Sequence, residues 1–189
     1  MAAGTLSGKR FWAQVQYAGV AAVPPLWLHF VLRYLGDARA TSRSLLLATT
    51  LPPIALVIAA ATSAHHALLW TGITLVPLAD GVRAIFHHGP LFWAGSAYHY
   101  VLLAWATLLL LRRSSPAGAA VDAQRRTLLV GAAVPWVANA LYLLGIGASW
   151  GLDLTPIAFG VTGICAVLAL ADLGLMALSP AQLWRGARR

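Results

Sequence analysis

The chain has 189 residues, of which 60% are hydrophobic and 10% charged, whereas a soluble domain carries roughly 25% charged residues. This balance excludes a soluble globular domain and indicates lipid as the solvent. Thirteen Lys and Arg against five acidic residues give a net charge of +8, but the basic residues lie in short clusters between apolar runs, as in membrane proteins. No polar segment is long enough to present a basic face to nucleic acid, so we expect no nucleic-acid partner.

Five apolar segments predict an all-α integral membrane protein, a bundle of about five transmembrane helices. Each segment has close to the about 20 residues that cross about 30 Å of hydrocarbon. A polar N-terminus (1–10) precedes the bundle (11–178), and a basic tail (179–189) follows it. With no evident signal peptide, the chain is expected to enter the membrane through its own helices. The predicted helices span residues 11–35, 44–61, 91–111, 127–145 and 156–178.

Prolines interrupt three of these predicted helices, at Pro24-Pro25, Pro52-Pro53 and Pro135. A proline inside a helix removes one hydrogen bond and kinks the axis. In a membrane the freed carbonyl needs a partner from a neighbouring helix or from water. The last helix has an ordinary start, because Thr155 can cap it and Pro156 fits its first position.

The connection over residues 62–90 is long, whereas the other connections are short. Its residues alternate in character, and Gly81 suits a turn, which favours a β-hairpin or an interfacial lid. The alternation sets Trp70, Gly72 and Thr74 against Thr71, Ile73 and Leu75.

Basic residues predict the orientation of the bundle. Ten of them fall on the side that holds the first and third connections and the C-terminus, and three fall on the other side. The positive-inside rule therefore places the C-terminus in the cytoplasm, and the N-terminus and the 62–90 loop outside. The ten are Arg33, Arg39, Arg43, Arg112, Arg113, Arg125, Arg126, Arg185, Arg188 and Arg189, and the three are Lys9, Arg10 and Arg83.

Two histidine pairs in the long loop, His65-His66 and His87-His88, form a candidate metal site. Neutral imidazoles suit zinc or copper, and a hairpin could bring three or four of them together. The alternatives are a pH-responsive role and ordinary interfacial histidines. No cysteine or glutamate joins them, and adjacent histidines rarely place both rings on one metal.

Polar side chains inside the predicted spans form a candidate ligand pocket, because such groups are costly in hydrocarbon. Tyr98, His99 and Tyr100 lie in the third helix, and Asn139 and Tyr142 in the fourth. The alternative is interhelical hydrogen bonding, worth about 0.6 kcal/mol and at most about 1.7.

The sequence does not predict an enzyme or a cofactor. It contains no glutamate, no paired carboxylates and no phosphate-binding loop. A haem between His29 and His99 is disfavoured, because they lie about 27 Å and about 12 Å from the outer ends of their helices.

Several motifs occur in one order: Tyr17 with Pro24-Pro25 and Trp27, His65 with Trp70, GPLFW from Gly89, Asn139, and DLTP from Asp153. In this combination the chain resembles the N-terminal seven-transmembrane region of bacterial and archaeal sensor histidine kinases. The resemblance covers most of the chain, from Phe11 to about Leu183. Members of that family usually have two more helices before the first one found here.

The resemblance implies a sensory input module of the plasma membrane. The last residues, SPAQLWRGARR, include no phospho-accepting histidine motif and no ATP-binding segment, so the output is expected in a separate protein or a second copy of the chain. We expect an apolar or amphipathic ligand, or a partner's helix, between the first, third and fourth helices. The alternatives are a small carrier and a structural subunit of a larger membrane complex.

Overall fold

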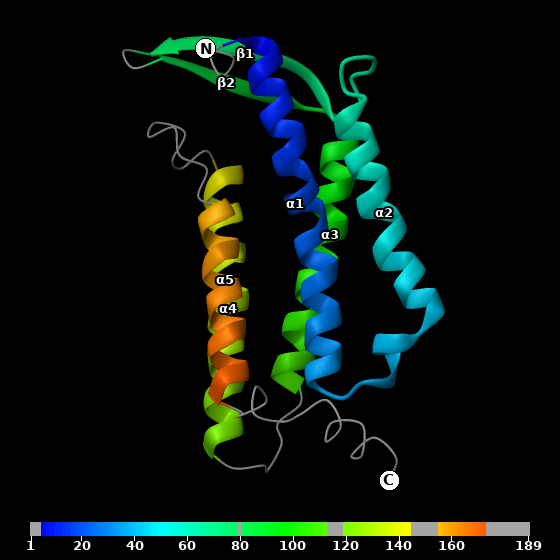
Figure 1. The fold of residues 1–189 in the computed structure, drawn as a ribbon, viewed down its shortest axis with the longest axis vertical. Coiled ribbons are helices and arrows are strands. Elements are labelled where there is room, and N and C mark those ends of the chain that lie inside the picture. Colours follow the sequence, from blue (N-terminus) through cyan, green and yellow to red (C-terminus); the bar gives the residue numbers. More distant parts are fainter. Residues whose placement is uncertain (1–4, 79–80, 113–118, 145–154, 173–189) are drawn as a thin grey trace. The chain divides into compact units, whose positions relative to one another are not determined.

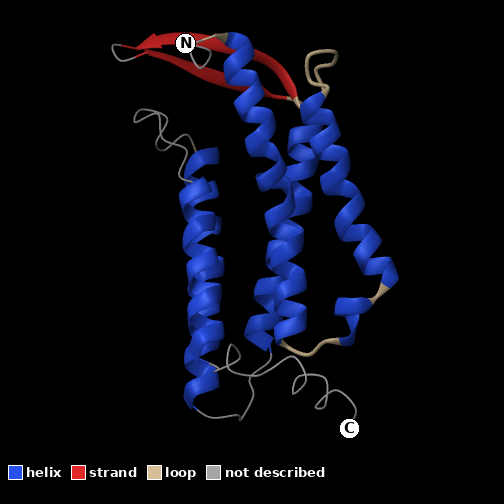
Figure 2. Ribbon diagram, in the orientation of Figure 1, coloured by secondary structure: helices blue, strands red, loops and turns tan. Residues whose placement is uncertain are grey.

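The protein is described by a computed structural model over residues 5–78, 81–112, 119–144 and 155–172. These residues form five α-helices, one 3-10 helix and two antiparallel strands (Figures 1 and 2). The chain divides into two compact units, Met1–Ala106 and Thr107–Arg189, which are described separately. The elements are α1 (Leu6–Tyr34), η2 (Ala38–Thr41), α2 (Arg43–Ala61), β1 (Trp70–Leu78), β2 (Gly81–His88), α3 (Pro90–Arg112), α4 (Ala119–Leu143) and α5 (Thr155–Asp172).

Most of the described chain is helical, as the composition predicts, and the β-hairpin is the exception to the all-α class. Three helices, α1, α2 and α3, are long and apolar enough to cross a membrane. Helix α5 has a shorter apolar stretch, Ile157–Ala169, within the residues that the structure describes.

Helix α2 has its more apolar face outward. Leu47, Leu51, Ile54 and Ile58 recur at helical spacing, and each is about half exposed. The buried face of the same helix includes the polar Thr49, which is only 3% exposed. A soluble helix shows the opposite pattern, so this helix is suited to lipid rather than water.

The second unit is a pair of closely packed helices. Gly131 of α4 lies against α5 so closely that an added Cβ would be 2.7 Å from the Cβ of Cys165. Pro135 lacks an N–H and so leaves the carbonyl of Gly131, four residues earlier, without its helical partner. The Thr162 hydroxyl of α5 donates to that carbonyl at 2.7 Å. This contact confirms the expectation that a neighbouring helix satisfies a carbonyl freed by a proline.

Helix α4 begins at Ala119, eight residues before the predicted start at Thr127. The prediction took the charged stretch with Asp122, Arg125 and Arg126 for a loop. Those residues have adequate helix propensity, and a helix that leaves the hydrocarbon can continue without an apolar face. The predicted residues 173–178 of the last helix and the tail 179–189 lie outside the described residues.

The hairpin of β1 and β2 lies at the end of the first unit where α1 begins (Figure 1). Ile73 pairs with Phe86 and Trp70 with His88, with a bulge between Trp70 and Gly72. The bulge corrects the predicted alternation, because it places Trp70 on the same face as Ile73 and Leu75. That face is apolar, whereas Thr74 and His87 lie on the opposite face together with Ile85.

Candidate functional site

The hairpin is fixed to the helices of the first unit at its open end. The Gly89 N–H donates to the Leu69 carbonyl at 2.8 Å, and the Leu91 N–H donates to the Leu68 carbonyl at 2.9 Å. Gly89 is needed at this joint, because an added Cβ would collide with the carbonyl oxygens of Ala67 and Leu68. The start of α3 is thereby held against the segment that follows α2.

An aromatic cluster holds the hairpin on α1. The Trp70 ring meets Tyr17 of α1 edge-on at 5.9 Å and Phe86 of β2 at 5.0 Å. Leu56 and Ala60 of α2 complete the buried cluster. The apolar face of β1 therefore faces the helices.

Gln14 of α1 binds the end of α2. Its side-chain amide donates to the Ala60 carbonyl at 3.0 Å and to the Ala61 carbonyl at 3.2 Å, and lies 3.4 Å from the Ser63 hydroxyl. Carbonyls in the last turn of a helix have no intrahelical partner. Gln14 thus caps α2 and fixes α1 beside it.

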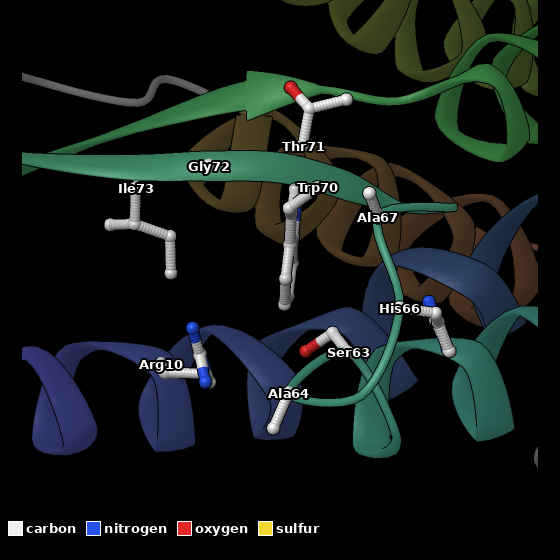
Figure 3. Close-up of a pocket in the computed structure, with 9 residues that line it drawn as sticks. All are labelled: Arg10, Ser63, Ala64, His66, Ala67, Trp70, Thr71, Gly72 and Ile73. Carbon is white, nitrogen blue, oxygen red and sulfur yellow. The ribbon is translucent and has the colours of Figure 1, made fainter.

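A pocket of about 260 Å³ lies between these parts (Figure 3). Trp70 and Ile73 extend from β1 toward Arg10 of α1, and the Ser63 hydroxyl turns toward the same space, whereas Thr71 lies on the other side of the strand (Figure 3). The pocket is lined by Arg10, Ser63, Ala64, His66, Ala67, Trp70, Thr71, Gly72 and Ile73.

The pocket is cationic. Arg10 is half-buried and has no ion pair or hydrogen bond among the described residues, in which the one ion pair joins Arg39 and Asp37. The lining contains no carboxylate. Such a site can accept a negatively charged group.

The predicted metal ligands lie at the open end of the hairpin, where His65 and His66 precede β1 and His87 and His88 end β2. His66 uses both ring nitrogens, since Nδ1 accepts from the Leu68 N–H at 3.3 Å and Nε2 lies 2.9 Å from the Thr62 hydroxyl. His65 is exposed, and His87 Nε2 lies 2.8 Å from the Thr74 hydroxyl. The described residues include no group of three or more His, Cys, Asp or Glu spaced to hold a metal ion, and the metal site stays a prediction.

His88 lies apart from its neighbour and stacks on Phe92, with ring centroids 3.6 Å apart, and meets Trp93 edge-on. Burial lowers the pKa of His88 below its ordinary value of 6.5, and the adjacent His87 lowers it further. The charged form of His88 is therefore disfavoured.

The predicted polar residues of α3 lie in a junction with α2. The Tyr98 hydroxyl donates to the Ala48 carbonyl at 3.2 Å and lies 3.4 Å from the Thr49 carbonyl. These are the two carbonyls that Pro52 and Pro53 leave without helical donors. The alternative considered for Tyr98, interhelical hydrogen bonding, is the arrangement observed.

Thr49 also binds α1. Its hydroxyl lies 2.8 Å from the Leu45 carbonyl oxygen and forms a hydrogen bond with His29 Nε2 at 2.7 Å. His29, Thr49 and Tyr98 therefore connect three helices through polar contacts. From the sequence, His29 was considered only as a haem ligand together with His99, and that haem was disfavoured.

The other predicted pocket residues are divided between the two units. His99 and Tyr100 are half-buried on α3 beside Tyr98, and His99 Nε2 is buried without a hydrogen bond. Asn139 is half-buried on α4, and Tyr142 lies on the same helix in the second unit. One pocket shared by all five residues stays a prediction.

Sequence reasoning missed Arg10, Ser63 and Gln14. A signal for Arg10 was present, since it is one of three basic residues on the side that the charge rule expects to be poor in them. Nothing in the sequence indicated Ser63 or Gln14, because their roles depend on how α1 lies against the end of α2.

The family described as the N-terminal 7TM region of histidine kinases matches residues 1–180. The chain belongs to this family. Its members are the sensory, non-catalytic membrane parts of histidine kinases, and the apolar helices agree with a membrane protein of this kind. Searches of curated proteins and of solved structures found no match.

Proposed function

We propose that this histidine-kinase 7TM region is an extracytoplasmic sensor that binds an amphipathic ligand beneath its β-hairpin. The signal passes to a separate protein or to a second copy of the chain. One observation carries the proposal: residues from three parts of the chain, α1, the turn after α2 and β1, line the same pocket. A ligand there contacts the outer ends of two candidate spans and the lid.

The contacts around the pocket support a coupling between ligand and helices. Gln14 joins α1 to the end of α2, and Trp70 joins β1 to α1. A ligand that fits one spacing of these parts better than another shifts the protein toward that spacing. A displacement of α1 or α2 at the outer end would reach η2 at the other end of the unit.

The proposed topology has five spans, with the N-terminus and the hairpin outside and the C-terminus in the cytoplasm. The excess of basic residues in the first and third connections and the C-terminal tail supports this orientation. Contacts between α4 and α5, including Thr162 with Gly131, support their insertion as a pair.

Native mass spectrometry of the protein, purified gently from its own membranes, tests the proposal. We expect a retained small molecule and an associated signalling protein. Ile73→Ser should abolish the small-molecule adduct, since Ile73 lines the pocket. Ile85→Ser is the matched control, because Ile85 belongs to the same hairpin, is 44% exposed and does not line the pocket.

Vesicle transport assays separate the alternatives. Flux of the retained molecule across reconstituted vesicles would contradict the sensor and establish a carrier. Bare protein, or protein bound in fixed ratio to another polypeptide with no small molecule, would contradict ligand sensing and favour a structural subunit.

A further inference from the structure

We propose that the pocket binds the anionic head of its ligand, a carboxylate or phosphate group, with Arg10 as the counter-charge. This inference rests on the proposed function and names the chemistry of the ligand. The source of the anion is either a free amphiphile or a lipid headgroup, and both present the same group to Arg10.

Arg10 is a charge without a partner in a partly enclosed site. It is half-buried, and within the described chain no carboxylate or carbonyl pairs with it. A guanidinium presents planar, paired N–H donors that match carboxylate and phosphate oxygens. An anion in the pocket would supply the missing partner.

Two further features agree with an anion at Arg10. Arg10 lies close to the N-terminal end of α1, and the partial positive charge at that end of a helix favours anions. It is also one of only three basic residues on the side of the chain that the positive-inside rule expects to be poor in them.

The remaining lining fits an amphipathic molecule. Ser63 is 8% exposed, and its hydroxyl accepts from Gln14 but donates to no group among the described residues. Trp70 and Ile73 provide an apolar wall beside it (Figure 3). The volume of about 260 Å³ lies just below the about 300–1,000 Å³ of pockets that enclose drug-sized ligands. It therefore suits a head group with a short apolar part.

The test uses the full chain in nanodiscs of phosphatidylcholine, with decanoate and decyl phosphate as free anionic probes and decanol as the neutral probe. Binding is followed by thermal shift and titration calorimetry. A second set of nanodiscs contains phosphatidylglycerol, and native mass spectrometry counts the lipids that remain bound.

Arg10→Gln should weaken binding of the anionic probes about ten- to a hundredfold, the range expected for loss of a hydrogen bond to a charged group. Lys9→Gln is the matched control, because Lys9 is the adjacent cation on α1 and does not line the pocket. Arg10→Lys keeps the charge and should retain part of the affinity. Near-ultraviolet circular dichroism checks that each variant keeps its aromatic packing.

Saturable binding of the free anions, lost in Arg10→Gln and kept in Lys9→Gln, supports a free amphiphile. Retention of phosphatidylglycerol with the same pattern, and no response to the free anions, supports a lipid headgroup. Equal losses of affinity for the anionic probes in Arg10→Gln and Lys9→Gln would overturn the proposal. Binding of decanol as tight as that of the anionic probes would also overturn it. Anion binding without any signalling partner would leave this inference intact while the proposed function fails.

Discussion

The hydroxyl of Tyr98 compensates for two prolines on another helix. Pro52 and Pro53 leave the carbonyls of Ala48 and Thr49 without donors, and the Tyr98 hydroxyl lies 3.2 and 3.4 Å from them. In hydrocarbon no water is present to take its place. The contact therefore contributes to the stability of the first unit.

Tyr98→Phe should lower the free energy of unfolding in detergent by about 0.6 kcal/mol and at most about 1.7. The same change in a Pro52→Ala, Pro53→Ala background should cost much less, because those alanines restore the helical donors. A double-mutant cycle by denaturant titration measures the difference. Equal costs in the two backgrounds would show that Tyr98 does not serve these carbonyls.

Gly89→Ala should destabilise the joint between the hairpin and α3. The new Cβ would collide with the carbonyls of Ala67 and Leu68, and overpacking of this kind costs about 1–3 kcal/mol. Gly19→Ala is the control, since nothing lies within 4 Å of a Cβ there. In a helix that change should gain about 0.5–1 kcal/mol. Thermal unfolding of the two variants should move in opposite directions.

The sequence shows which backbone carbonyls lack a helical donor, but it does not show which side chains donate to them. The three proline sites predict such carbonyls, and at two of the sites Tyr98 and Thr162 supply the hydrogen bond. The partners themselves depend on the register between helices, which no single segment encodes. Gln14 could not be predicted for the same reason, because it caps α2 only through the way α1 lies against the end of that helix.

Close approach of α4 and α5 depends on Gly131. Gly131→Ala should separate the helices and cost about 1–3 kcal/mol, because the added Cβ falls 2.7 Å from that of Cys165. Cys165→Ala should not rescue it, since the Cβ remains. Cys165→Gly should rescue it in part, offset by about 1 kcal/mol of lost helix propensity. Equal rescue of stability by Cys165→Ala and Cys165→Gly would show that the Cβ of Cys165 is not the source of the steric conflict.

The hairpin should loosen in acid. Because burial lowers the pKa of His88, the unfolded state takes up a proton first, so stability falls as pH drops below the ordinary value of 6.5 toward the lowered one. Unfolding temperatures measured from about pH 7.5 to about pH 4.5 should show this loss. His88→Phe, which keeps a ring against Phe92, should flatten that part of the profile. An unchanged profile would exclude His88 as the cause.

Element positions were predictable where apolar length alone decides them. Helices α2 and α3 lie within one residue of the predicted 44–61 and 91–111. Helices α1 and α4 begin at Leu6 and Ala119, before their predicted starts at residues 11 and 127, because their first turns are polar or charged and extend beyond the apolar segment. The hairpin was foreseen from its alternation, but the bulge after Trp70 was not, because the alternation continues through it.

For the molecule as a whole, the orientation can be tested with single cysteines. Thr71→Cys and Thr41→Cys, each in a Cys165→Ser background, place an exposed thiol at opposite ends of the first unit. With the hairpin outside, an impermeant maleimide should label only the first in intact cells and both after permeabilisation. The reverse pattern would invert the proposed topology.

The predicted ligand pocket and the pocket beneath the hairpin involve different residues. The sequence directs attention to polar residues inside the spans, where hydrocarbon makes them conspicuous, and a ligand pocket among them stays a prediction. The pocket beneath the hairpin lies at the end of the first unit, and Arg10 lines it together with residues of the turn and strand after α2. The sequence singled out Arg10 and His66 for other reasons, Arg10 as a basic residue on the side poor in them and His66 as a candidate metal ligand.

The proline and tyrosine contact also bears on how the protein enters the membrane during synthesis. Helix α2 leaves the ribosome with two carbonyls whose partner in the folded unit is Tyr98 of α3, and unsatisfied backbone groups are unfavourable in lipid. Helix α2 is therefore a poor candidate to leave the translocon alone. We expect it to wait there until α3 arrives, so that the two partition into the bilayer as a preformed pair, with the hairpin between them translocated in the same event.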